Sequence, residues 1–294
     1  MNDFLVKSLS YNNFVRIYAT STTHTLNSIG KRMNYYPSAL AAVGRVLSVG
    51  VMMGGMLKKD ERITIKVDGN GPIGLIMVDA NARGEVRAYA GNPHCHFEYH
   101  DHKLNVQATV GDKGLISVIK DLNLKEPFIG TVPIISGEIG EDFAYYFSNS
   151  EQIPSAVSLG VLVNEDNLAI TSGGFIVQLL PNTPEEVIDL LEKRIFDLPS
   201  ISSMLSAGIT PEDIIRLIGD ESTIIIETIP VEFKCSCSRE RFERGILSLG
   251  YEEIKSMFEE DKEAHTVCHF CGNEYHFNQN DLQKIMLIAK KNSV

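Results

Sequence analysis

The chain of 294 residues lacks an uninterrupted apolar segment long enough to cross a membrane. Its most apolar stretch runs from Met33 to Leu57, but Arg45 divides it into two uncharged runs of 12 residues. A spanning helix needs about 20 consecutive apolar residues, so we expect a buried helix and no membrane partner. The first residues, MNDFLVKSLSYNN, lack a basic segment followed by an apolar one, so we expect no signal peptide and a cytoplasmic protein.

Basic charge is scarce. The chain has 27 Lys and Arg residues against 38 Asp and Glu residues, a net charge of −11. Sequence-independent binding to nucleic acid depends on cations that contact phosphates, so we expect no nucleic-acid partner. The hydrophobic fraction of 44% and the charged fraction of 22% are those of a chain that folds over most of its length. Its length allows one large domain or two of ordinary size.

Residues 1–182 predict an α+β domain with mainly antiparallel strands. Asp68–Pro72 (DGNGP) is a turn between two strands, and without a following Lys-Ser/Thr it is not a phosphate loop. Residues 138–155 predict a helix that ends near Pro154. We find no credible Ser/His/Asp arrangement and expect no enzyme. The segments that predict strands are 13–22, 62–80, 84–91, 105–111, 115–122, 128–135 and 173–181.

Residues 183–230 contain two near-copies, TPEEVIDLLEK (183–193) and TPEDIIRLIGD (210–220). Each predicts a short amphipathic helix with Thr at the N-cap, Pro at the first helical position and acids in the first turn. Helices this short are marginal alone and need a surface on which to pack. This segment is either a small helical subdomain or a metastable helical linker whose stability depends on its neighbours.

Cysteine is also scarce, and four of the five cysteines lie in a C-terminal module, residues 231–294. They form two pairs, Cys235-x-Cys237 and Cys268-x-x-Cys271. In a cytoplasmic protein such cysteines are metal ligands or redox groups, since thiols stay reduced there. Two sulfurs from each of two turns suit one tetrahedral Zn²⁺ per chain. An iron–sulfur cluster is the rival, and its usual spacings are absent.

The surroundings of these cysteines favour thiolates and a metal-dependent fold. Ser238 predicts the cap of a helix whose positive end faces Cys235 and Cys237. The module has few apolar residues, so a domain of about sixty residues would depend on its metal to fold. Once the metal leaves, the sulfurs within each pair are close enough to bond, and such short loops would not restore the fold. The nearby cations are Lys234, Arg239, Arg241 and Arg244.

Together with these cysteines, three further segments resemble the heat-shock protein 33 family, the 33 kDa chaperonins, which are redox-regulated holdases of bacteria. They are DGNGP (Asp68–Pro72), YFSNSEQIPS (Tyr146–Ser155) and GGFIVQLLP (Gly173–Pro181), and the resemblance covers nearly the whole chain. It implies that the four cysteines hold zinc in a reduced, inactive state. It also implies a role in protein folding during oxidative stress.

The resemblance further implies the course of activation. Under oxidant and unfolding stress, Cys235 pairs with Cys237 and Cys268 pairs with Cys271. Zinc leaves, the C-terminal module unfolds and the linker loosens. A homodimer then binds unfolding client proteins without ATP. No motif marks the residues that hold clients, and we predict the apolar linker faces: Val187, Leu191, Ile214 and Ile218.

Two other functions stay open for the cysteine module. It could be a zinc ribbon with a purely structural metal, serving as a nucleic-acid- or protein-binding adaptor. Nine basic and eleven acidic residues in 231–294, a net charge of −2, oppose nucleic-acid binding. It could also be a thiol oxidoreductase that uses Cys268-x-x-Cys271, but bound zinc would block that activity and no thioredoxin-like context surrounds the motif.

One more group of residues invites a metal. The segment HCHFEYHDH contains Cys95 and four histidines, His94, His96, His100 and His102. On a regular strand these histidines would share one face. The alternative, which we favour, is an exposed histidine-rich loop with a free thiol. The family resemblance offers no role for it.

Overall fold

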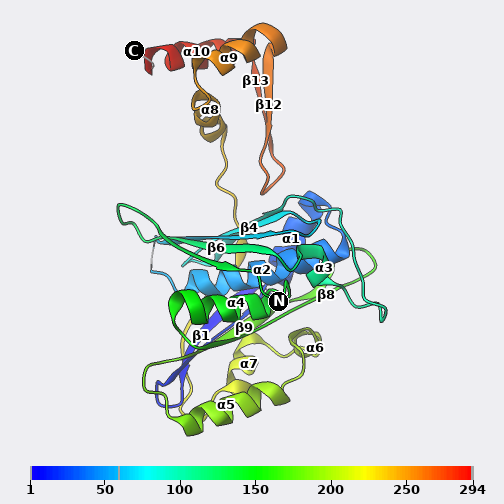
Figure 1. The fold of residues 1–294 in the computed structure, drawn as a ribbon, viewed down its shortest axis with the longest axis vertical. Helices are drawn as coiled ribbons and strands as arrows, with labels where there is room; N and C mark the ends of the chain where they lie inside the picture. Colours follow the sequence, from blue (N-terminus) through cyan, green and yellow to red (C-terminus); the bar gives the residue numbers. More distant parts are fainter. Residues whose placement is uncertain (1, 59, 293–294) are drawn as a thin grey trace. The chain divides into compact units, whose positions relative to one another are not determined.

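Two sheets are built from the alternating apolar segments of the chain (Figure 1). The computed structural model describes residues 2–58 and 60–292, and these fall into an N-terminal unit, Met1–Lys234, and a C-terminal unit, Cys235–Val294. The strands of the N-terminal unit are β1 (Phe4–Ser10), β2 (Val15–Ser21), β3 (Arg62–Gly69), β4 (Leu75–Asn81), β5 (Glu85–Ala90), β6 (Gly114–Asp121), β7 (Phe128–Pro133), β8 (Ser155–Val163), β9 (Ala169–Leu179), β10 (Ile224–Pro230) and β11 (Glu232–Phe233).

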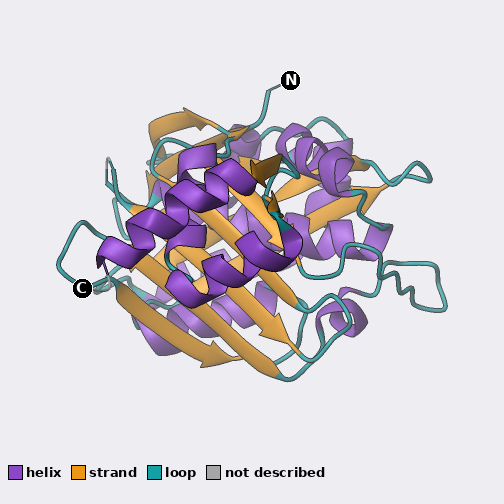
Figure 2. Cartoon of the chain, turned by 90° about the horizontal axis from the view of Figure 1, so that it is seen from above, coloured by secondary structure: helices purple, strands orange, loops and turns teal. Residues whose placement is uncertain are grey.

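The strand order follows mostly from hairpins. One sheet has the order β10-β1-β2-β9-β8, and the other has the order β11-β5-β4-β3-β6-β7. All pairs are antiparallel except β11 with β5. Figure 2 shows both helices and strands, and they alternate along the described part of the chain, so the predicted α+β class is confirmed. The division at residues 182 and 230 stays a prediction.

The apolar stretch forms helix α2 (Pro37–Gly55), which lies between the two sheets (Figure 1). By length and composition α2 could cross a membrane, but 94% of its most apolar window is buried inside the protein. This confirms the predicted buried helix. Arg45 is tolerated there because it pairs with Glu138 at 2.5 Å. A Cβ on Gly44 would lie 2.5 Å from the Leu26 side chain, so a larger residue there would force the packing to shift.

The remaining helices of the N-terminal unit cover the sheets. They are α1 (Thr23–Met33), α3 (Val106–Val110), α4 (Gly140–Tyr146) continued by a π-helical turn (Phe147–Glu151), α5 (Glu185–Asp197), α6 (Ile201–Ser206) and α7 (Pro211–Ile218). Helices α5, α6 and α7 come from the predicted linker, and they pack on the face of the five-stranded sheet opposite α2 (Figure 1). The neighbours on which these short helices depend are therefore β1, β2, β8 and β9.

Two local predictions are wrong. Residues 105–111, expected as a strand, form α3, because the Asn105 side chain caps the helix by accepting from the backbone N–H of Ala108. Thr183 is not an N-cap, since its hydroxyl donates to the carbonyl of Leu180 and Pro184 occupies the cap position. Thr210 does cap α7, in a reciprocal capping box with Asp213.

The C-terminal unit is small. It contains α8 (Arg239–Leu247), α9 (Tyr251–Ser256) with a π-helical turn (Met257–Asp261), the hairpin β12 (Glu263–Val267) and β13 (Glu274–Asn278), and α10 (Gln279–Asn292). The predicted strand, turn and returning strand are confirmed, with Gly272 left-handed at φ +72°. Among the residues whose burial is described, its apolar core contains six that are buried, Ile246, Ile254, Phe277, Leu282, Ile285 and Ala289.

Candidate metal centre

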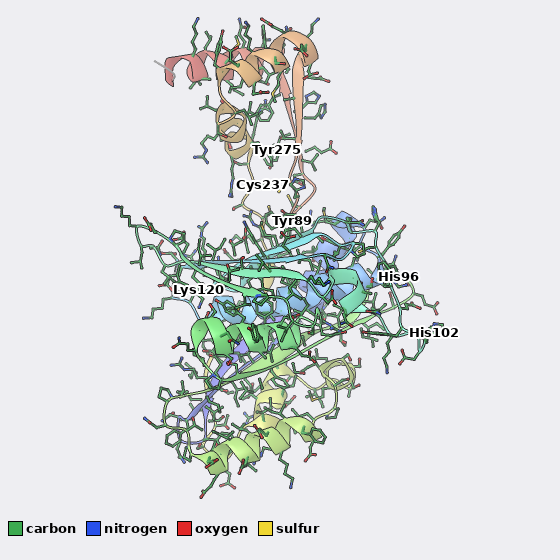
Figure 3. The ribbon with its side chains drawn as sticks, viewed as in Figure 1. Tyr89, His96, His102, Lys120, Cys237 and Tyr275 are labelled. Carbon is green, nitrogen blue, oxygen red and sulfur yellow. The ribbon has the colours of Figure 1, made fainter. Side chains whose placement is uncertain are left out.

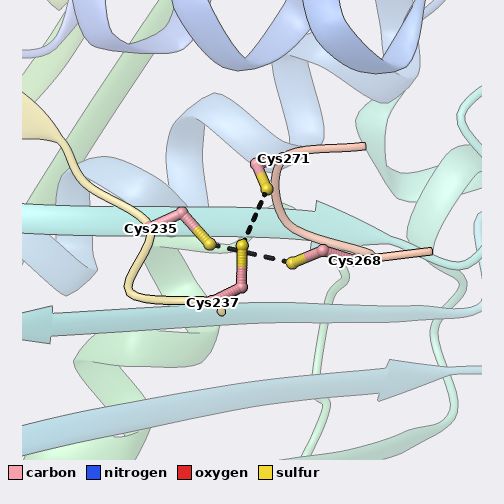
Figure 4. A group of neighbouring side chains, drawn as sticks. All are labelled: Cys235, Cys237, Cys268 and Cys271. Atoms are coloured by element: carbon pink, nitrogen blue, oxygen red, sulfur yellow. Dashed lines mark hydrogen bonds between the residues drawn. The ribbon is translucent and has the colours of Figure 1, made fainter. Parts of the chain in front are cut away.

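Four sulfur atoms of the C-terminal unit lie around one point (Figure 4). All of them are within 4.8 Å of one another. The Sγ atoms of Cys235 and Cys268 are 3.7 Å apart, and those of Cys237 and Cys271 are 3.3 Å apart. Four sulfurs about 2.3 Å from a central zinc would be separated by about 3.8 Å. The donor set therefore fits a tetrahedral four-thiolate site.

The turn between β12 and β13 positions Cys268 and Cys271. The backbone N–H of Cys268 donates to the carbonyl of Asn273 at 2.9 Å, and the N–H of Gly272 donates to the carbonyl of Cys268 at 2.8 Å. Both bonds bend the chain so that the two sulfurs lie on the same side of the turn. The Cys268 and Cys271 side chains are 5% and 6% exposed, so this half of the site is shielded from water.

The start of α8 positions Cys235 and Cys237. The Ser238 side chain caps the helix by accepting from the backbone N–H of Arg241, as the sequence predicts. Both cysteines precede this positive helix end, which favours sulfur anions. Both are partly exposed, so an oxidant can reach this half of the site more easily than the other.

Tyr275 is part of the site, although no pattern in the sequence pointed to it. Its hydroxyl donates to Cys237 Sγ at 3.1 Å, and the two side chains lie side by side in Figure 3. Burial would raise the pKa of Cys237, but hydrogen bonds from Tyr275 and the neighbouring thiols outweigh it and lower that pKa to about 7. The same hydrogen bond raises the pKa of Tyr275 to about 12. Burial raises the pKa of Cys268 and Cys271.

Two of the predicted neighbouring cations have other partners. Lys234 pairs with Glu85, and Arg239 pairs with Asp281 at 2.7 Å while its guanidinium lies 4.3 Å from the centroid of the Phe277 ring. Each of these two cations is therefore neutralised by a carboxylate, which weakens its electrostatic effect on the sulfurs. The groups in direct contact with Cys237 Sγ include the Tyr275 hydroxyl, the Asn273 side chain and the Cys271 thiol.

A model of the Hsp33 protein family matches residues 3–278. This chain belongs to the Hsp33 family. The 33 kDa chaperonin of Geobacillus sp. (strain WCH70) is 50% identical over 292 residues, which cover 99% of each chain. That of Bacillus subtilis (strain 168) is 49% identical over 282 residues, covering 96% of this chain and 97% of the relative.

A solved structure agrees with the Hsp33 assignment. The crystal structure of the 33 kDa chaperonin (heat shock protein 33 homolog) from Thermotoga maritima matches with a TM-score of 0.91 at 31% identity, covering 99% of this chain and 100% of that one. Membership of the Hsp33 family supports a chaperone function in the stress response and implies a role other than catalysis.

The predicted client-contact residues lie far along the chain from the cysteines and are not open to solvent. Leu191 is 3% exposed, Ile214 and Ile218 are fully buried, and Val187 is partly buried. All four pack in the second apolar core of the N-terminal unit, between the linker helices and the five-stranded sheet. They could contact a client only after these helices leave the sheet, and their role stays a prediction.

The histidine-rich segment is a loop, as we favoured, with a single bridge between Glu98 and Leu104. His96 and His102, both labelled in Figure 3, lie 3.1 and 3.4 Å from the Glu98 carboxylate. Within this described loop the four histidines do not converge on one point. The Cys95 thiol is buried at 6% exposure, and burial raises its pKa.

Proposed function

We propose that this protein is a redox-regulated, ATP-independent holdase that binds unfolding proteins and prevents their aggregation under oxidative stress. The observation that carries the proposal is the four-sulfur centre within a unit whose described residues include a small core of six buried apolar residues. Such a unit depends on a metal for its fold. Removing the ligands by oxidation therefore removes the fold.

Cys235, Cys237, Cys268 and Cys271 would hold one Zn²⁺ per chain. When bound, the zinc joins the start of α8 to the β12–β13 turn and stabilises the small fold between them. The pKa of Cys237 is lowered, whereas burial raises the pKa of Cys268 and of Cys271, and Cys237 is partly exposed. We therefore expect the Cys237 thiolate to attack a peroxide before Cys268 or Cys271 does.

Oxidation converts each pair of thiols into one disulfide. Two thiols lose two electrons and two protons to a peroxide, the S–S bond forms and hydrogen peroxide becomes two waters. We expect the pairs Cys235–Cys237 and Cys268–Cys271. Each closes a loop of only a few residues, so neither constrains the unfolded unit. The opposite pairing would join the two halves of the site and preserve the fold.

In the reduced protein, the sulfur–sulfur contacts join the two halves of the site instead, Cys235 with Cys268 and Cys237 with Cys271. The pairing is therefore decided during oxidation, as the unit opens, and peptide mapping of the oxidised protein distinguishes the two outcomes. Disulfides between the halves would contradict unfolding by oxidation, because they would hold α8 against the hairpin.

Unfolding of the C-terminal unit would affect the linker through the segment of chain that connects them. Cys235 follows β11 by two residues, and β10 before it is an edge strand that pairs with β1. An edge strand has one partner and is easily detached. Release of β10 and of α5, α6 and α7 would expose the apolar core around Leu191, Ile214 and Ile218 to client proteins. We place the protein in the cytoplasm and its active form as a homodimer.

The test measures zinc release and aggregation suppression on one sample treated with peroxide at mild heat. We expect one zinc released, four thiols lost and suppression of a test protein's aggregation, without ATP. The Cys95→Ser variant is the matched control and should behave as the wild type. Zinc release with no gain of suppression, or equal suppression by the reduced protein, would refute the proposal.

A further inference from the structure

The β12–β13 hairpin carries a second group of metal-ligating side chains, Glu263, His265 and His276. Their ligand atoms all lie within 4.8 Å of one another, and all three residues are exposed. Glu263 and His265 alternate on β12 and so share one face of the hairpin. His265 lies directly opposite His276 across the strand pair. The backbone register thus brings all three to one face.

The side chains lie close enough together to share one ligand. The ring centroids of His265 and His276 are 3.6 Å apart, and His276 Nε2 lies 3.7 Å from a Glu263 carboxylate oxygen. That separation is longer than an ordinary hydrogen bond, so the carboxylate and the ring do not satisfy each other. Two imidazoles and one carboxylate are a common zinc donor set that leaves a position for water.

We propose that Glu263, His265 and His276 form a second metal site, a reversible surface site for Zn²⁺ that is separate from the four-thiolate centre. Nitrogen and oxygen ligands survive peroxide, whereas thiolates do not. The ligands come from both strands, so the ion binds only the folded hairpin and stabilises it. This hairpin also carries Cys268 and Cys271 at its turn. An occupied second site would therefore delay the opening of the C-terminal unit.

The test is a zinc titration of the reduced full-length protein that already holds one zinc, by equilibrium dialysis with a zinc buffer. We expect a second equivalent to bind at micromolar free zinc. The His265→Ala/His276→Ala variant should keep the first equivalent and lose the second. The matched control, His96→Ala/His102→Ala, removes two histidines around Glu98 and should keep both. No second equivalent in the wild type, or its survival in the His265→Ala/His276→Ala variant, would overturn the proposal.

A milder variant guards against loss of the hairpin fold. Glu263→Gln keeps both imidazoles and should weaken the second site by about tenfold or more. The imidazole resonances of His265 and His276 should shift together with the second equivalent in the wild type, and need more zinc to do so in Glu263→Gln. An unchanged affinity in Glu263→Gln, or shifts confined to other histidines, would exclude the assigned ligands.

Discussion

The two units of this chain are stable for different reasons. In Met1–Lys234 two sheets enclose α2, and large side chains such as Tyr35, Phe143 and Tyr146 are fully buried. In Cys235–Val294 six apolar residues form the core and four sulfurs share one point. Burial of apolar surface can stabilise the first unit, whereas in our proposal the second depends on a metal. On that proposal, one chemical event unfolds the second unit and leaves the first intact.

Metal removal should give the largest difference between the units. Structural zinc sites contribute about 10–16 kcal/mol of apparent binding free energy, so a strong chelator should unfold residues 235–292 in the reduced protein. Hydrogen exchange measured by mass spectrometry should show loss of protection there and unchanged protection in β1 to β9. Cys268→Ser should have the same effect without chelator. Retained protection of β12 and β13 after chelation would show that the six-residue core suffices.

Equal truncations in the two cores should have unequal consequences for metal binding. Phe143 is 0% exposed and Phe277 is 1% exposed, so changing either to Ala should cost about 3–5 kcal/mol. Because folding of the C-terminal unit and zinc binding are coupled, Phe277→Ala should shift the chelator midpoint strongly. Phe143→Ala should lower the melting temperature of the N-terminal unit and leave the chelator midpoint unchanged. Equal midpoints for both variants would show that the units do not fold separately.

The difference between the units also explains which features could be predicted from the sequence. Cysteine spacing is local, so the hairpin, the turn at Gly272 and the cap at Ser238 could all be predicted. Strands β1, β8 and β10 were not predicted, and β10 lies at the end of the segment that was expected to be helical. The alternation that indicated a strand at 105–111 also fits one turn of helix, and the Asn105 cap decides between them.

Within the site, spacing identified the four clustered cysteines but not their neighbours. Tyr275 reaches Cys237 only because the hairpin folds back, and a tyrosine four residues after Cys271 carries no pattern of its own. The linker faces were predicted as apolar from their periodicity. Periodicity shows that such a face needs a partner, but not that the partner is the five-stranded sheet.

A substitution in the linker should have a smaller effect. The linker helices pack against the five-stranded sheet and are part of the first unit. Ile214 is fully buried, whereas Leu217 on the same helix is 47% exposed. Ile214→Ala should cost about 2–5 kcal/mol and loosen α5, α6 and α7 from the sheet. Its reduced form should then suppress aggregation of a test protein at lower temperature than the wild type. Leu217→Ala is the matched control, and equal behaviour of the two variants would argue against client binding by the covered face.

The smallest effect should come from Tyr275→Phe, which deletes one hydroxyl and leaves the hairpin intact. Without that donor the pKa of Cys237 should rise from about 7 toward the usual cysteine value of about 8.5. Less thiolate at neutral pH means weaker metal binding, by about tenfold, and the loss should shrink as the pH rises above both pKa values. The metal affinity is measured by competition with a chelator at pH values below and above both pKa values, with Tyr251→Phe as the control. A loss that is independent of pH would mean that Tyr275 acts through packing, because an effect on the ionisation of Cys237 disappears once Cys237 is fully ionised in both proteins.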